Sequence, residues 1–257
     1  MRILVCNDDG AAAPGLALLA EAALAVGSDV WKVAPDHKWT AASHQLSFDR
    51  DLTLTANGER SFVCSGTPAD CVVAAMAILF VHGPKPDLVL AGVNDKRNVA
   101  EDVAYSGTMA IAREGAFWGI PAIGVSKTNG VADRQAELAT LRRLLQVLWN
   151  GRRDWAAEGH WLSVNLPASV PGTLTQARIG RDKIASACDV LEMTPGCITY
   201  RIRRGRPGSG AQNDENACID AGRTTIVRQH WSADAALPET VVSAWNDAIA
   251  LPTRPFP

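Results

Sequence analysis

Residues 2–27, "RILVCNDDGAAAPGLALLAEAALAVG", contain the pattern that decides the fold. The apolar run at 2–6 predicts a buried strand, and the mostly apolar segment at 15–26 predicts a helix that ends at Gly27. A second apolar run, "DVWKV" at 29–33, predicts the next strand. A strand, a helix and another strand at this spacing indicate a βαβ unit with parallel strands.

The same alternation continues for more than a hundred residues. Thr67, Pro68 and Asp70 have the spacing of an N-cap, a first helical position and a capping box. Further strands are predicted at 60–64, 87–92, 122–126 and 161–165, and further helices at 69–80, 106–118 and about 133–149. Strands that alternate with helices in this way predict a three-layer α/β/α fold with a mostly parallel, Rossmann-like sheet.

The alternation weakens after about residue 170. A predicted strand at 197–204 would place Arg201 and Arg203 on one face. It is followed by a predicted loop at 205–217, a strand at 224–229 and a short helix at 239–250. We therefore predict an α/β catalytic domain at 1–184 and a hairpin-rich C-terminal extension at 185–257, which we expect to form an oligomer.

Composition excludes several classes of protein. The net charge of −2 argues against a stable nucleic-acid complex, and no apolar run approaches the roughly 18 residues of a membrane span. The six cysteines form no C-x-x-C pair, and the chain opens on a strand pattern instead of a signal peptide. We expect a cytoplasmic protein that does not associate with membranes.

Three loops should meet at one edge of the sheet, because a parallel sheet binds ligands at the carboxyl ends of its strands. Asp8 and Asp9 follow the first strand, the loop 34–44 follows the second, and 94–108 follows the strand at 87–92. Carboxylate, amide and hydroxyl oxygens suit a hard divalent cation such as Mg²⁺ or Mn²⁺.

Residues 106–108, "SGT", begin a predicted helix, where free backbone N–H groups favour a phosphate. Each part of this pattern has a simpler alternative. N-D-D-G is also a good turn sequence, Ser106 also suits a plain N-cap, and Asn94 and Asn98 also suit an ordinary loop. The agreement among three loops favours a metal-assisted phosphoester hydrolase.

The chain resembles the SurE family of stationary-phase survival proteins, which are metal-dependent nucleotidases and acid phosphatases. The resemblance rests on "ILVCNDDGAAAPG", "APDHKWTAASH", "GTPADCV", "AGVNDKRNVAEDVAYSGT", "AREGAFWGIPAIGVS" and "SVNLP", in family order over about residues 1–167. It implies that Asp8, Asp9, Asn94 and Thr40, the last in place of a serine, bind the metal. It further implies catalytic roles for Asp8, Asp9 and Asn98, and phosphate contacts from Asn98, Ser106, Gly107 and Thr108.

The resemblance also implies a nucleotide or another small phosphomonoester as substrate, and a homodimer or homotetramer. The chain departs from the family at Asp95-Lys96-Arg97, where Arg-Gly-Ala is usual, and at Trp39, where an arginine is common. Residues 222–227, "GRTTIV", replace a longer family pattern. The alternative hypothesis is a catalytically impaired nucleotide-binding or regulatory homologue. A dinucleotide-dependent oxidoreductase is disfavoured, because no G-x-G-x-x-G follows the first strand.

Overall fold

The central element of the computed structural model is a sheet with the strand order β3-β4-β2-β1-β5-β6-β7-β11-β8. The structure describes residues 1–128, 133–182, 184–203, 205, 213–232 and 238–250. The strands of this sheet are β1 (Arg2–Cys6), β2 (Asp29–Pro35), β3 (Leu54–Ala56), β4 (Ser61–Cys64), β5 (Leu88–Asn94), β6 (Ala122–Lys127), β7 (His160–Leu166), β8 (Leu174–Gln176) and β11 (Thr224–His230). Most neighbouring strands are parallel, and β3–β4 and β7–β11 are antiparallel.

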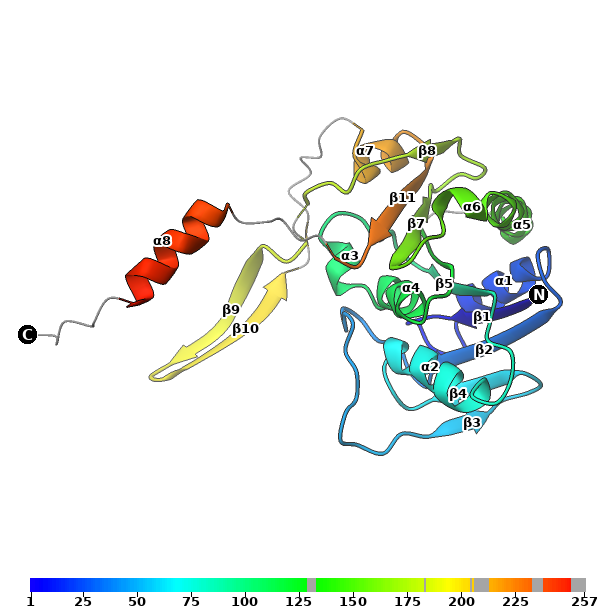
Figure 1. The fold of residues 1–257 in the computed structure, drawn as a ribbon, viewed down its shortest axis with the longest axis horizontal. Coiled ribbons are helices and arrows are strands. Elements are labelled where there is room, and N and C mark those ends of the chain that lie inside the picture. The colour runs from blue at the N-terminus through cyan, green and yellow to red at the C-terminus, as the bar shows by residue number, and fades with distance from the viewer. Residues whose placement is uncertain (129–132, 183, 204, 206–212, 233–237, 251–257) are drawn as a thin grey trace, which may run out of the picture.

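Helices cover both faces of this sheet, which confirms the predicted three-layer α/β/α fold (Figure 1). One face carries α1 (Pro14–Ala23) and α5 (Arg134–Asn150), and the other carries α2 (Pro68–Ala74) and α4 (Gly107–Phe117). The shorter helices are α3 (Asp102–Tyr105), α6 (Arg152–Trp155) and α7 (Glu215–Asp220), and α8 (Glu239–Ala250) follows them. No helix among the described residues combines the length and the apolar character that a membrane span needs.

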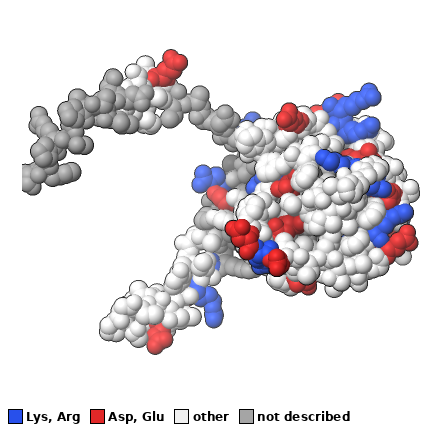
Figure 2. Space-filling view, turned by 60° about the horizontal axis from the view of Figure 1, so that its bottom comes forward, with Lys and Arg blue, Asp and Glu red and all other residues white. Residues whose placement is uncertain are grey.

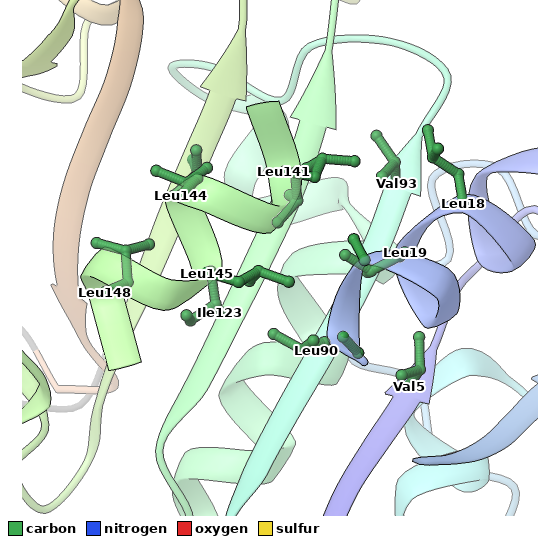
Figure 3. Packing of buried hydrophobic residues seen from close by; sticks show 14 of the residues in the cluster. Val5, Leu18, Leu19, Leu90, Val93, Ile123, Leu141, Leu144, Leu145 and Leu148 are labelled. Carbon is green, nitrogen blue, oxygen red and sulfur yellow. The ribbon is translucent and has the colours of Figure 1, made fainter. Parts of the chain in front are cut away.

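The core follows from the alternation of side chains along the strands. In β1, Ile3 and Val5 pack with α1 and α5, whereas Leu4 and Cys6 pack with α2 and α4. Figure 3 shows the first of these layers, where Leu145 of α5 lies above the strands. Truncating such a fully buried leucine to alanine costs about 2–5 kcal/mol of folding free energy.

The predicted helix start at Thr67 is confirmed. Its hydroxyl accepts a hydrogen bond from the Asp70 N–H, and the Asp70 carboxylate accepts one from the Thr67 N–H. The single helix predicted at 69–80 was wrong in its second half, because residues Ala75–Leu79 form a π-helical segment. The loop predicted after the strand at 87–92 likewise contains a short helix, α3.

The C-terminal segment divides between a projecting hairpin and the main sheet. The antiparallel strands β9 (Ala187–Thr194) and β10 (Cys197–Arg203) extend away from the body, as Figure 1 shows. Between them, Pro195 fixes φ and Gly196 has a φ of +82°, as a type II turn requires. The register places Arg201 and Arg203 on one face of β10.

The chain after residue 185 does not form the hairpin alone. Strand β11 returns to the main sheet and pairs with β7, and α7 packs beside these strands. Helix α7 begins within the segment 205–217 that was predicted to be a loop, so the prediction was wrong for residues 215–217. The division of the chain into two domains at residue 184 therefore stays a prediction. Part of the segment 185–257, strand β11, belongs to the central sheet.

Candidate active site

A cavity of about 880 Å³ opens at the carboxyl edge of the sheet. It lies there because β1, β2, β5, β6 and β7 are mutually parallel and end on the same side. Six of the residues predicted for the site line this cavity, namely Asp8, Asp9, Thr40, Asn94, Asn98 and Ser106. The structure therefore brings together side chains from three loops that are far apart in sequence.

Asp8 is the most constrained of these residues. It is buried at the end of β1, and its Oδ1 accepts a hydrogen bond from the Thr108 hydroxyl at 2.5 Å. Burial raises the pKa of Asp8 to about 6, the Thr108 bond lowers it, and the charge of Asp9 raises it further. A carboxylate in this environment is stabilised by a nearby cation.

Because Gly107 has no side chain, helix α4 can approach Asp8 closely. A Cβ atom at this position would lie 2.7 Å from the Cβ of Asp8 and 3.0 Å from the Cγ of Pro68. Thr108 is fully buried, and its hydroxyl is engaged by Asp8. Gly107 and Thr108 thus lie behind Asp8, and what they can offer a ligand is the backbone N–H groups of the helix N-terminus.

Asp9 is held by a residue that the sequence analysis did not identify. The Lys38 ammonium forms ion pairs with Asp9 Oδ1 and, at 2.9 Å, with Asp95 Oδ2. Partial burial lowers the pKa of Lys38, but the hydrogen bonds to Asp9 and Asp95 outweigh this effect and raise it overall. A lysine in a polar loop gives no sequence signal for its partner, so only the structure reveals this contact.

The remaining predicted ligands supply neutral oxygens. Asn94 ends β5, and its Nδ2 donates to the Lys96 carbonyl at 2.5 Å, which leaves Oδ1 as the atom able to bind a cation. Thr40 lies exposed on the loop after β2. The described residues contain no cluster of three or more His, Cys, Asp or Glu side chains suited to a metal. The donor set consists of two carboxylates, an amide and a hydroxyl, which fits Mg²⁺ or Mn²⁺.

Asn98 is fixed by residues from two other strands. Its Nδ2 donates to Ser126 Oγ at 2.8 Å, and its backbone N–H donates to Asn165 Oδ1 at 2.8 Å. Asn165 Nδ2 donates back to the Asn98 carbonyl at 3.0 Å. Ser126 and Asn165 lie near the carboxyl ends of β6 and β7, so the edge rule that predicted Asp8 would also have found them.

The loop that follows Asn94 is tied to the C-terminal segment. Arg97 Nη1 donates to Asp220 Oδ1 at 2.6 Å, and Arg181 Nε donates to Glu101 Oε1 at 2.6 Å. Both residues line the cavity, but the Arg97 guanidinium pairs with Asp220 of α7, whereas Lys96 is exposed. These two neighbouring cations, which replace the usual glycine and alanine, therefore differ in their exposure and in their contacts.

A buried carboxyl group supports the same loop. Glu215 Oε1 accepts a hydrogen bond from the Ala100 N–H at 3.4 Å, and Glu215 Oε2 accepts one from Asn165 Nδ2 at 3.5 Å. Burial raises the pKa of Glu215 to about 8, although the Ala100 bond lowers it, and the charges of Asp214 and Asp102 raise it further. Glu215 could not be singled out from the sequence, because it lies in the segment that was predicted to be a loop.

The helix N-terminus at the cavity is the start of α4. Ser106 Oγ accepts a hydrogen bond from the Met109 N–H at 3.1 Å, so Ser106 is an N-cap, as the simpler alternative held. Ser106 nevertheless lines the cavity, and the partial positive charge of the helix N-terminus lies beside it. The two alternatives for Ser106 are therefore compatible.

Fold and site together define a doubly wound α/β protein with a carboxylate-lined ligand site at the carboxyl edge of its sheet. The chain belongs to the SurE family: the family model described as "Survival protein SurE" matches residues 3–186. The resemblance recognised from the sequence motifs is confirmed.

Individual relatives agree with this assignment. A protein named 5′-nucleotidase SurE from Methylocella silvestris is 50% identical over 135 residues, which are 52% of this chain and 53% of the relative. Another of the same name, from Rhodopseudomonas palustris, is 44% identical over 174 residues, or 66% of this chain and 68% of the relative. The aligned part of the chain thus spans about half the length of the first relative.

A solved structure agrees over a longer range. The crystal structure of the SurE protein from Aquifex aeolicus superposes with a TM-score of 0.80 at 25% sequence identity. The superposition covers 97% of this chain and 100% of that one, so the likeness extends beyond the residues that the family model matches.

Proposed function

We propose that this protein is a metal-dependent phosphomonoesterase that hydrolyses nucleoside monophosphates, as a 5′/3′-nucleotidase. The observation that carries the proposal is the meeting of Asp8, Asp9, Asn94, Asn98 and Ser106 in one cavity of a SurE-family chain. The names of the relatives, 5′-nucleotidase SurE, support the choice of substrate class.

In this proposal Asp8, Asp9, Asn94 and Thr40 hold a divalent cation, either Mg²⁺ or Mn²⁺. Such an ion supplies Lewis-acid polarisation of the phosphoryl oxygens. The carboxylates of Asp8 and Asp9 take part in catalysis by positioning the attacking group. The closeness of Thr108 to Asp8 fixes the orientation of one of these carboxylates.

The phosphate would lie between Asn98 and the start of α4. The Asn98 nitrogen and backbone are held by Ser126 and Asn165, so its Oδ1 has a fixed place from which to orient a water or a substrate hydroxyl. Ser106 and the backbone N–H groups of Gly107 and Thr108 would bind phosphoryl oxygens, because a helix N-terminus stabilises negative charge.

The test is phosphate release from a panel of nucleoside 5′- and 3′-monophosphates, with and without Mg²⁺ or Mn²⁺. We expect turnover that chelation by EDTA abolishes and either ion restores. Tight nucleotide binding without phosphate release would instead support the impaired regulatory homologue.

We also propose that the protein forms a homodimer or homotetramer through the β9–β10 hairpin. Met193, Ile198 and Tyr200 are 68%, 54% and 59% exposed, and the register places them on one face. Figure 2 shows the projecting hairpin as a mostly uncharged surface. Light scattering should report an oligomer that Ile198→Asp with Tyr200→Asp converts to a monomer.

We further propose that the protein is located in the cytoplasm. Cys188 and Cys197 are exposed free thiols on the hairpin, and such thiols are retained in a reducing compartment. Cell fractionation that recovers the protein with periplasmic or secreted material would contradict this location.

A further inference from the structure

The contact between Lys38 and Asp9 has a consequence for metal binding. The ammonium touches Asp9 Oδ1 and Asp95 Oδ2, so it bridges the loop after β2 and the loop after β5. The Asp9 side chain is only 9% exposed, while those of Lys38 and Asp95 are 47% and 55% exposed. The ammonium therefore binds the more buried carboxylate from the solvent side.

The backbone holds Lys38 in this position. The Trp39 N–H donates to the Asp8 carbonyl at 2.7 Å, and the Ala11 N–H donates to the Pro35 carbonyl at 2.9 Å. The chain that precedes and follows Lys38 thus runs directly along the N-D-D-G turn. On the opposite side the Asp95 N–H donates to Asp9 Oδ2 at 3.4 Å. Both oxygens of Asp9 are therefore engaged by groups of this chain.

We propose that Lys38 is an internal cation that competes with the divalent metal for Asp9, and thereby sets the metal affinity of this protein. The inference rests on the proposed metal site. The Lys38 ammonium takes up a lone pair of Asp9 Oδ1 that a metal ion would use, and two cations a few ångströms apart repel each other. Because only the fraction of molecules with Asp9 released is competent to bind, the apparent affinity falls by that fraction.

Asp95 makes this competition reversible. It is the second partner of the same ammonium, so Lys38 keeps one charged hydrogen bond when the metal displaces it from Asp9. A bound metal would leave Lys38 on Asp95 at the cavity wall. The protein therefore loads metal only when the ion is abundant enough to displace the lysine.

The test is a Mn²⁺ titration of metal-free protein, in which electron paramagnetic resonance measures the free ion directly. Lys38→Met should tighten Mn²⁺ binding about tenfold or more, because it removes one unit charge from beside Asp9. Lys38→Arg, which keeps the charge, should bind as weakly as the wild type. Lys96→Met is the matched control, because it removes the same charge from the same cavity but not from Asp9. It should tighten binding by less than about threefold.

Asp8→Asn separates this inference from the proposed function. If Asp8→Asn abolishes Mn²⁺ binding while Lys38→Met binds no more tightly than the wild type, the competition is disproved and the metal site stands. If Asp8→Asn leaves binding intact, or if neither the wild type nor Lys38→Met binds Mn²⁺, the metal site itself is disproved and the inference fails with it. The competition would also be supported if Mn²⁺ binding to the wild type were too weak to measure while Lys38→Met bound the ion.

Discussion

Two walls of the cavity are held by different forces. The packed wall, formed by Asp8 with Gly107 and Thr108 behind it, is buried where α4 meets the end of β1. The tethered wall, formed by residues 94–102, is held through polar contacts with Asn165, Glu215 and Asp220. The partners of the tethered wall are 67, 115 and 123 residues away in sequence.

Because different forces hold the two walls, each wall should respond to different changes. The packed wall depends on close contact between atoms, so it should be sensitive above all to changes of side-chain volume. The tethered wall depends on charges and on a buried carboxyl group, so it should respond to pH and to changes in the C-terminal segment. Four predictions, from the largest expected effect to the smallest, test this contrast.

The largest effect is expected from Asp8→Asn in the packed wall. The change preserves size but removes a negative charge from the proposed ion site, so kcat should fall by about three orders of magnitude or more. The melting temperature without metal should not fall, because the variant removes a buried charge that desolvation already disfavours.

The control for this variant is Asp36→Asn, which changes an exposed aspartate outside the cavity and should leave kcat nearly unchanged. Activity and metal titration should be measured beside each melting curve. A folded Asp8→Asn protein with near-normal activity would make N-D-D-G a turn and nothing more.

The second prediction adds one methyl group to the packed wall. Gly107→Ala places a Cβ 2.7 Å from the Asp8 Cβ, so Asp8 or the helix must move. Displacement of a catalytic carboxylate should reduce kcat by up to about a hundredfold and cost roughly 1–3 kcal/mol of stability. Gly83→Ala, whose Cβ would approach only Arg2 Nη1 at 4.0 Å, should affect neither quantity. Equal effects in both variants would contradict the tight packing.

The same contrast explains how much could be predicted from the sequence. Asp8, Asp9, Asn94 and Asn98 could be placed together because each follows a predicted strand, and parallel strands share their carboxyl edge. The cap formed by Thr67 and Asp70 is predictable because its partners are three residues apart. These features depend on local spacing alone.

The features that were missed depend on distant partners. The sequence suggested the strand at 224–229 but not that β11 pairs with β7. The hydrophobic alternation of a strand does not indicate which other strand it pairs with. From the sequence alone, Glu215 and Lys38 have the character of ordinary solvated charges. Only the fold shows that Glu215 contacts Ala100 and that Lys38 contacts Asp9. Most of the packed wall was therefore predictable, and the contacts that hold the tethered wall were not.

The third prediction tests the tethered wall by pH. The folded pKa of Glu215, about 8, exceeds its ordinary value, so the folded state binds the proton more tightly than the unfolded state. Stability should therefore fall as pH rises between about 4.5 and 8, by about 2 kcal/mol between pH 5 and pH 7. Glu215→Gln, which imitates the protonated acid, should remove this part of the slope.

The measurement is urea unfolding of both proteins across this pH range. The informative quantity is the difference between the two slopes, because every other titrating group is common to both proteins. Parallel curves for the wild type and Glu215→Gln would show that the proton on Glu215 does not stabilise the tethered wall.

The smallest effect is expected from Arg97, and it distinguishes the two cations of the tethered wall. Both side chains line the cavity, but only Lys96 is exposed there, so Lys96→Ala should raise KM for a nucleoside monophosphate by about threefold to tenfold with little change in kcat. Arg97 is paired with Asp220, so Arg97→Ala should change KM by less than about twofold and cost only about 0.5 kcal/mol of stability. Asp220→Asn should cause the same small loss, and the double variant should be no less stable than either single one, because the two side chains act as a pair. A KM increase in Arg97→Ala as large as that in Lys96→Ala would mean that the Arg97 guanidinium leaves Asp220 for the substrate phosphate, and that the tethered wall opens when substrate binds.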